Sequence, residues 1–147
     1  LDKYPPDVVI LAGHDSSVLG TLGKRRYFDA AATLPPVLRT SRIVVFGDTP
    51  VPDFDLGTCL VNHWSNLDRC VLRRSKSVDA DAITVAREAA DRLDALFVDT
   101  SKVVCPQERC PPVRGNVMMY RDYDHLSVEF ARTQSSQLAS ALSGVLR

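Results

Sequence analysis

The run Val8-Val9-Ile10-Leu11-Ala12 decides the fold class of this chain. Unbroken apolar runs are typical of strands in a parallel sheet that is covered by helices on both faces. We therefore expect a central strand at this position. Two shorter apolar runs, Ile43–Phe46 and Leu96–Val98, predict further strands, and Asn116–Tyr120 predicts a short extended segment.

Segments with helical spacing separate these strands. Lys24–Leu34 predicts a helix that ends at a Pro-Pro pair, and a second helix is expected from a cap at Asp79 or Asp81 to about Leu93. Phe130–Leu146 predicts a closing helix. Strands that alternate with helices indicate an α/β fold, with an open, mostly parallel sheet between helices in three layers.

Length and charge limit the classes of function. The 147 residues are enough for one hydrophobic core, and we expect a single domain over residues 1–147. Lys and Arg total 18, as do Asp and Glu, so no broad positive field indicates nucleic acid as a partner. No apolar run is long enough to span a bilayer, and the first residues lack the pattern of a signal peptide. The missing initial Met suggests a piece of a longer protein, with any export signal outside it.

The four cysteines form two pairs that are close in sequence. Residues 47–74 are rich in Pro, Asp and Asn and predict a long loop, which holds Cys59 and Cys70. Cys105 and Cys110 flank a short polar stretch. Disulfides persist in oxidising compartments, so we predict both local bonds and an exported protein. Four cysteines permit three connectivities, and a zinc site is the alternative, although neither pair has the short spacing of a zinc knuckle.

An acid precedes a histidine by three residues in the segment Arg121-Asp122-Tyr123-Asp124-His125-Leu126-Ser127. Histidine acts as a general base when one ring nitrogen faces the nucleophile and an acceptor holds the other. Asp122 and His125 are therefore the candidate catalytic pair. The structural alternative is a helix N-terminus that is capped by Ser127, with Asp124 near its positive end and His125 as an ordinary boundary residue.

Polar residues follow each predicted strand, at the edge of the sheet where α/β proteins bind ligands. They are Gly13-His14-Asp15-Ser16, Gly47-Asp48-Thr49 and Asp99-Thr100-Ser101. For His14 and Asp15, the structural alternative is a turn in which the Asp side chain bonds its own backbone.

The run YRDYDHLS at residues 120–127 resembles the last sequence block of the SGNH hydrolase superfamily. PPDVVILAG at residues 5–13, RIVVFGDTP at residues 42–50 and the two cysteine pairs are similar to one group within it. This group comprises the extracytoplasmic SGNH domains fused to membrane acyltransferases of the acyltransferase family three. The resemblance covers most of the chain and implies the three-layer SGNH fold, with or without its first strand.

The resemblance also implies a function and a location. Enzymes of this group transfer or remove O-acyl groups on cell-surface glycans or glycolipids. The domain is then tethered in the periplasm, or on the outer face of the plasma membrane, by a membrane acyltransferase domain in the same parent chain. No cofactor or metal is implied.

Individual residues take roles from the same resemblance. Asp122 and His125 match the acid and base of a Ser-His-Asp triad. Gly13 matches the oxyanion block, where Asp15 stands near the family's Asn and His14 is a substitute donor. The family's nucleophilic serine lies in a Gly-Asp-Ser sequence, which does not occur here, so we expect the serine in a segment outside this chain.

Other hydroxyl groups also follow the strands, namely those of Ser16, Ser17, Thr49 and Ser101. Thr49 imitates the serine of Gly-Asp-Ser, but Pro50 removes a backbone NH and restrains Thr49 to an extended conformation. We therefore expect a structural loop there.

Trp64, in the loop of the first cysteine pair, is the candidate for stacking on a sugar, and its structural alternative is burial in the core. A basic cluster consists of Arg73, Arg74 and Lys76. It either binds an anionic glycan or lipid head group or is merely a solvated surface cluster. A non-catalytic glycan-binding or scaffolding domain of the same fold is the alternative function. A flavodoxin-like nucleotide binder is disfavoured because no glycine-rich phosphate loop follows any strand.

Overall fold

The computed structural model describes residues 4–13 and 40–145, which form two compact units. Of these residues, unit 1 contains 4–13, 40–48, 79–100 and 141–145, and unit 2 contains 49–78 and 101–140. The chain therefore passes between the units four times. The predicted helix at Lys24–Leu34 lies outside the described residues.

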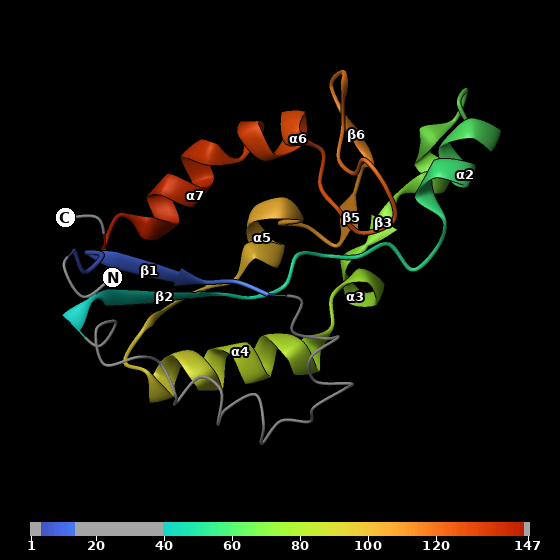
Figure 1. The fold of residues 1–147 in the computed structure, drawn as a ribbon. Coiled ribbons are helices and arrows are strands. Elements are labelled where there is room, and N and C mark those ends of the chain that lie inside the picture. Colours follow the sequence, from blue (N-terminus) through green and yellow to red (C-terminus); the bar gives the residue numbers. More distant parts are fainter. Residues whose placement is uncertain (1–3, 14–39, 146–147) are drawn as a thin grey trace. The chain divides into compact units, whose positions relative to one another are not determined.

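Unit 1 contains a parallel sheet in the order β1-β2-β4, of which Figure 1 labels β1 and β2. This sheet and its helix confirm the predicted α/β class. β1 (Val8–Leu11) and β4 (Leu96–Val98) flank β2 (Arg42–Phe46), and all strands pair in parallel. The prediction that the first strand is central is wrong for the described sheet. β2 has a neighbour on each side and contains the buried Val44 and Val45, whereas Ile10 of β1 is 49% exposed.

Helix α4 (Ala80–Arg92) packs on β2 and β4 of this sheet. Asp79 caps it, because the carboxylate accepts a hydrogen bond of 3.0 Å from the amide of Ala82. The buried face is largely alanine, and Ala86 and Ala90 contact Val45 in the core of unit 1. These small side chains let α4 approach the sheet closely. Gly47 has the same effect, because a Cβ at this position would lie only 2.9 Å from Cδ1 of Ile83 in α4.

Residues 49–78 of unit 2 do not form the predicted long loop. They contain α2 (Leu56–Asn62), the 3₁₀ helix η2 (Leu67–Cys70), β3 (Leu72–Arg73) and α3 (Arg74–Ser77). Leu56 and Leu60 lie one helical turn apart and are both buried, and Asp55 caps α2 through the amide of Thr58. This buried pair and its cap outweigh the polar composition of the segment.

The second half of unit 2 consists of short elements and a helix pair. The elements are α5 (Thr100–Val104), β5 (Arg109–Cys110), β6 (Val113–Arg114), β7 (Val117–Met118), α6 (Val128–Thr133) and α7 (Ser135–Leu142). The first residue of α5 and the last two of α7 belong to unit 1. β5 pairs antiparallel with β3, and β6 pairs antiparallel with β7. The turn between β6 and β7 contains Gly115, which adopts φ +59°. The predicted extended segment at 116–120 is thus one arm of a hairpin.

The predicted single closing helix is divided at Gln134 into α6 and α7. The hydroxyl of Thr133 donates to the carbonyl of Phe130 at 2.7 Å, and this carbonyl is the acceptor that a continuous helix would offer to the Gln134 amide. The Gln134 amide instead bonds to Ala131. A local side-chain bond therefore competes with the helix at this point.

Both predicted disulfides are present, and they anchor the core of unit 2. Cys59 bonds Cys70 with Cα atoms 5.8 Å apart, and Cys105 bonds Cys110 with Cα atoms 5.6 Å apart. All four cysteines are thus used, which excludes the zinc alternative. The surrounding core includes the fully buried Leu72, Met119, Tyr120 and Phe130.

Candidate active site

The loop that carries Asp122 and His125 is shaped by its own backbone. The carboxylate of Asp122 accepts hydrogen bonds from the amides of Asp124 at 3.2 Å and His125 at 2.8 Å. The amide of Arg121 donates to the carbonyl of His125 at 2.9 Å, which closes the base of the loop. An Asp at the start of such a turn bonds backbone groups two and three residues ahead. The turn therefore brings the side chains of Asp122 and His125 together.

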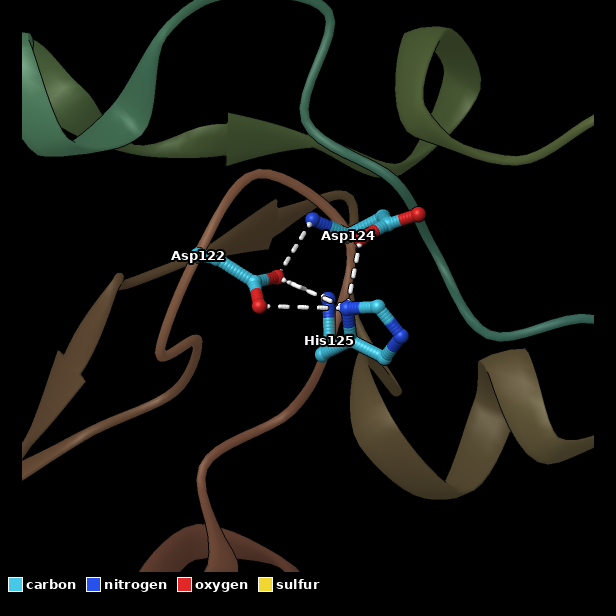
Figure 2. Close-up of side chains that lie close together, drawn as sticks. All are labelled: Asp122, Asp124 and His125. Atoms are coloured by element: carbon cyan, nitrogen blue, oxygen red, sulfur yellow. Dashed lines mark hydrogen bonds and ion pairs between the residues drawn. The ribbon is translucent and has the colours of Figure 1, made fainter.

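The imidazole of His125 faces two carboxylates with a single nitrogen (Figure 2). Nδ1 lies 3.0 and 3.1 Å from the two carboxylate oxygens of Asp122, and 2.8 Å from Oδ1 of Asp124. The Asp122 contacts have hydrogen-bond geometry, whereas Asp124 Oδ1 has no hydrogen-bond partner and contributes its charge. The acids favour the tautomer with its proton on Nδ1, so Nε2 is left as an acceptor.

The charges of the loop suit a base that is held by an ionised acid. Hydrogen bonds from the amides of His125 and Asp124, with His125 itself, lower the pKa of Asp122 to about 2. Asp122 is therefore ionised at neutral pH. The nearby charge of Asp124 raises the pKa of the Tyr123 hydroxyl. The His125 side chain is 60% exposed, and Figure 2 shows Nε2 turned away from both acids.

The helix cap that was the structural alternative is also present, next to the pair. Ser127 Oγ accepts a hydrogen bond of 3.0 Å from the amide of Phe130 and donates one of 2.5 Å to the carbonyl of Met118. This cap begins α6 and ties the loop to β7. The cap and the Asp122–His125 pair use different residues, so one does not exclude the other.

The same three side chains are the group in the described residues that could ligate a metal. One ligand atom each of Asp122, Asp124 and His125 lies within 4.8 Å of the others. Nδ1, the ring nitrogen that faces both acids, already contacts the Asp122 carboxylate. The arrangement thus serves either a held imidazole or a metal, and the hydrogen-bond geometry fits the held imidazole.

The sequence matches the family model described as the SGNH domain fused to AT3 domains over residues 1–140. The chain belongs to this family. A comparison with curated protein sequences gave no match. None of the helices in the described part of this SGNH domain is long and apolar enough to cross a membrane.

A solved structure has a fold similar to that of this SGNH domain. It is the periplasmic domain of a lipopolysaccharide acetyltransferase from Salmonella ser. Paratyphi A, with a TM-score of 0.69 and 18% sequence identity. The match covers 95% of this chain and 58% of the other. At this identity the likeness shows a shared fold.

The other predicted site residues of the SGNH domain have different outcomes. Gly13 is exposed after β1, whereas His14, Asp15 and the serines at 16 and 17 lie outside the described residues. The strand ends of β2 and β4 meet as predicted, because the Gly47 amide donates to the Val98 carbonyl at 3.0 Å. The Thr100 hydroxyl also donates to the carbonyl of Gly47.

Ser101 is unsuited to nucleophilic attack, because it is fully buried and accepts a hydrogen bond of 2.8 Å from the Arg74 guanidinium. Arg74 also donates to the Cys105 carbonyl at 3.0 Å, so this member of the predicted basic cluster has a structural role. Trp64 is 75% exposed, which excludes the alternative of a tryptophan tucked into the core. Its stacking on a sugar stays a prediction.

Sequence reasoning missed the second acid beside the imidazole. The sequence pattern indicates Asp124 only as a charge near a helix end, yet its Oδ1 lies 2.8 Å from Nδ1 of His125. The turn reverses the backbone between residues 122 and 125, so residues one and three positions before the histidine both reach its ring. An Asp-x-Asp-His spacing in a predicted turn was the available signal.

Proposed function

We propose that this SGNH domain supplies the acid and the base of an ester acyl transfer. The reaction moves O-acyl groups on cell-surface glycans or glycolipids, and the domain works outside the cytoplasm, tethered by an AT3 membrane domain of the same parent chain. The observation that carries the proposal is the Asp122 carboxylate on Nδ1 of His125, with Nε2 exposed. The two disulfides fit an oxidising compartment.

In the proposed mechanism, His125 Nε2 removes the proton of a serine hydroxyl while the serine oxygen bonds to the acyl carbon. Collapse of the tetrahedral intermediate breaks the ester bond, and Nε2 returns the proton to the leaving oxygen. A glycan hydroxyl or water then takes the acyl group by the reverse steps. Because no Gly-Asp-Ser occurs in residues 1–147, we propose that the serine comes from another part of the parent protein.

The two acids have distinct parts in this proposal. Asp122 holds the tautomer and stabilises the imidazolium, since its pKa of about 2 keeps it ionised throughout the cycle. Asp124 adds a second negative charge near the imidazolium. The amide of Gly13, with His14 or Asp15 beside it, is proposed for the oxyanion, and Trp64 for a sugar of the glycan.

Acyl transfer by the full-length parent protein tests the proposal. We expect His125→Asn to lower the rate by at least about 10³-fold, and Asp122→Asn by about 10²- to 10⁴-fold. The readout is the O-acyl content of the surface glycan, measured by mass spectrometry in cells that produce each variant at equal levels. His63→Asn is a matched control, because His63 is half-buried at the end of α2 and is absent from the pair.

Transfer at the unaltered rate by the His125→Asn variant would contradict the catalytic role. In that case the non-catalytic alternative, a glycan-binding or scaffolding domain of the same fold, would account for the chain.

A further inference from the structure

A cavity of about 530 Å³ lies beside the pair, wholly within unit 2. Its lining comes from two segments that are far apart in sequence, residues 52–57 with Leu60 and residues 120–123 with Met118. Small-molecule sites have volumes of roughly 300–1,000 Å³. Asp122 belongs both to the cavity wall and to the pair. A ligand in the cavity therefore contacts one residue of the pair.

The walls of the cavity are fixed to one another by the core of unit 2. Leu56, Leu60 and Tyr120 belong to the same buried cluster, and the Tyr120 hydroxyl donates to the carbonyl of Pro50. The Cys59–Cys70 disulfide ties α2 to η2. A site that keeps its shape without a ligand loses less entropy on binding.

The rim of the cavity is acidic, whereas its floor is apolar. Asp53, Asp55 and Asp122 contribute carboxylates, and Arg121 is the single basic residue of the lining. Arg121 is engaged, because its Nε lies 3.3 Å from Oδ2 of Asp122. The amide of Thr58 lowers the pKa of Asp55, which keeps that acid ionised. The field at the rim therefore disfavours anionic ligands, while carboxylates accept hydrogen bonds from hydroxyl groups.

An exposed aromatic ring completes the lining. Tyr123 is 71% exposed, and Met118 beside it is 46% exposed. A rigid, amphipathic ring of this kind can contact the C–H face of a sugar while its hydroxyl stays in water. Trp64, the residue predicted from the sequence for this purpose, is absent from the lining.

We infer that this cavity is the acceptor subsite, and that it takes a neutral, hydroxyl-rich sugar unit, with acids on the sugar hydroxyls and Tyr123 on its apolar face. The assignment as acceptor subsite rests on the proposed function, whereas sugar binding does not require catalysis. An anionic sugar such as a uronate is disfavoured by the three carboxylates of the rim.

Titration of the labelled chain by NMR tests binding without any reaction. The probes are neutral oligosaccharides of gluco, manno, galacto and rhamno configuration, and oligouronates of the same length. We expect at least one neutral probe to shift the resonances of Met118 and Tyr123, and the oligouronates to leave them unchanged at equal concentration. Stronger shifts with an oligouronate, or no shift with any neutral probe, would overturn the inference.

Variants locate the binding and separate it from catalysis. Tyr123→Ala should weaken binding of the neutral probe about fivefold, and Tyr123→Phe should retain it, because the ring is kept. Tyr4→Ala is the matched control, since Tyr4 is a 77% exposed tyrosine outside the cavity. Loss of binding in Trp64→Ala but not in Tyr123→Ala would contradict the cavity assignment.

The His125→Asn variant distinguishes this inference from the proposed function. We expect it to bind the neutral probe as the wild type does while the full-length variant loses acyl transfer. Transfer without binding at the cavity would overturn the inference alone, and binding with unaltered transfer in His125→Asn would overturn the proposed function alone.

Discussion

Asp122 holds a turn and an imidazole with one carboxylate. Its Oδ1 accepts from the amides of Asp124 and His125, and it also lies 3.0 Å from Nδ1 of the ring. The backbone bonds lower the pKa of this acid, so the loop that positions the histidine also keeps its partner charged. Replacement of Asp122 therefore affects the turn and the imidazole together.

The pH dependence of stability should report the charge of Asp122. Its folded-state pKa of about 2 lies below the value of about 3.9 for an unfolded Asp. A lowered pKa adds stability that is fully present above the unfolded value and is lost as the pH falls to the folded value. We expect wild type to exceed Asp122→Asn in free energy of unfolding at pH 7, with the difference shrinking from about pH 4 to about pH 2. Denaturant melts measure this, and a difference that does not vary with pH would contradict it.

At the residue scale, the sequence was sufficient for contacts within one turn. The spacing of Asp122 and His125 predicted their proximity, because a turn of this length has few conformations. The lining of the cavity joins Phe54 to Tyr123 and was not predictable, since no local pattern connects residues that tertiary packing brings together.

Helix α2 shows how composition misleads at the scale of an element. Pro, Asp and Asn around it favour a loop, whereas Leu56 and Leu60 at helical spacing behind the Asp55 cap favour a helix. Helix α4 was predicted correctly because its cap and its apolar spacing agree over a longer segment. A short helix has too few apolar positions at helical spacing for a sequence-based prediction to outweigh the polar composition of the residues around it.

The cap of α6 should contribute measurably to stability. Ser127→Ala removes the acceptor for the Phe130 amide and the donor to the Met118 carbonyl, both at a buried position. We expect a loss of about 1–2 kcal/mol in the free energy of unfolding. Ser136→Ala, at an exposed position of α7, is the control and should stay within about 0.5 kcal/mol. Equal effects of the two changes in urea melts would argue against the cap.

The Cys59–Cys70 disulfide should stabilise unit 2, because it restricts the conformations of the unfolded chain. It joins residues separated by 11 positions, and the loop-entropy model assigns about 3 kcal/mol to a loop of this size. We expect the Cys59→Ala, Cys70→Ala double variant to lose about that amount in denaturant melts. Reduction of the wild type under conditions that spare Cys105–Cys110, checked by peptide mass mapping, should reproduce the loss. A double variant as stable as wild type would refute the stabilising role of this disulfide.

At the scale of the whole molecule, the path of the chain favours cooperative folding. The described part of unit 1 is assembled from separate segments, and the chain crosses between the units four times. Neither unit is one continuous stretch of sequence. The prediction of a single domain therefore implies that the units fold together.

Matched core truncations test this cooperativity. Val44 in unit 1 and Leu72 in unit 2 are both fully buried. We expect Leu72→Ala to cost about 2–5 kcal/mol and Val44→Ala roughly 1–3 kcal/mol, each by shifting one common transition. Methyl NMR signals of Val44 and Leu72 follow each unit separately, and circular dichroism follows both units. Separate transitions, with each variant shifting a different one, would show two independent domains.

The confinement of Asp122 and His125 to one turn has a consequence for the regulation of the proposed acyl transfer. Asp122 and His125 keep their mutual geometry whenever unit 2 moves, because the turn itself holds them. Such a displacement alters the reach of Nε2 toward its target hydroxyl, while the contact of Nδ1 with Asp122 is preserved. Motion of unit 2 would then change how often Nε2 meets the hydroxyl, while the Asp122–His125 contact would stay the same.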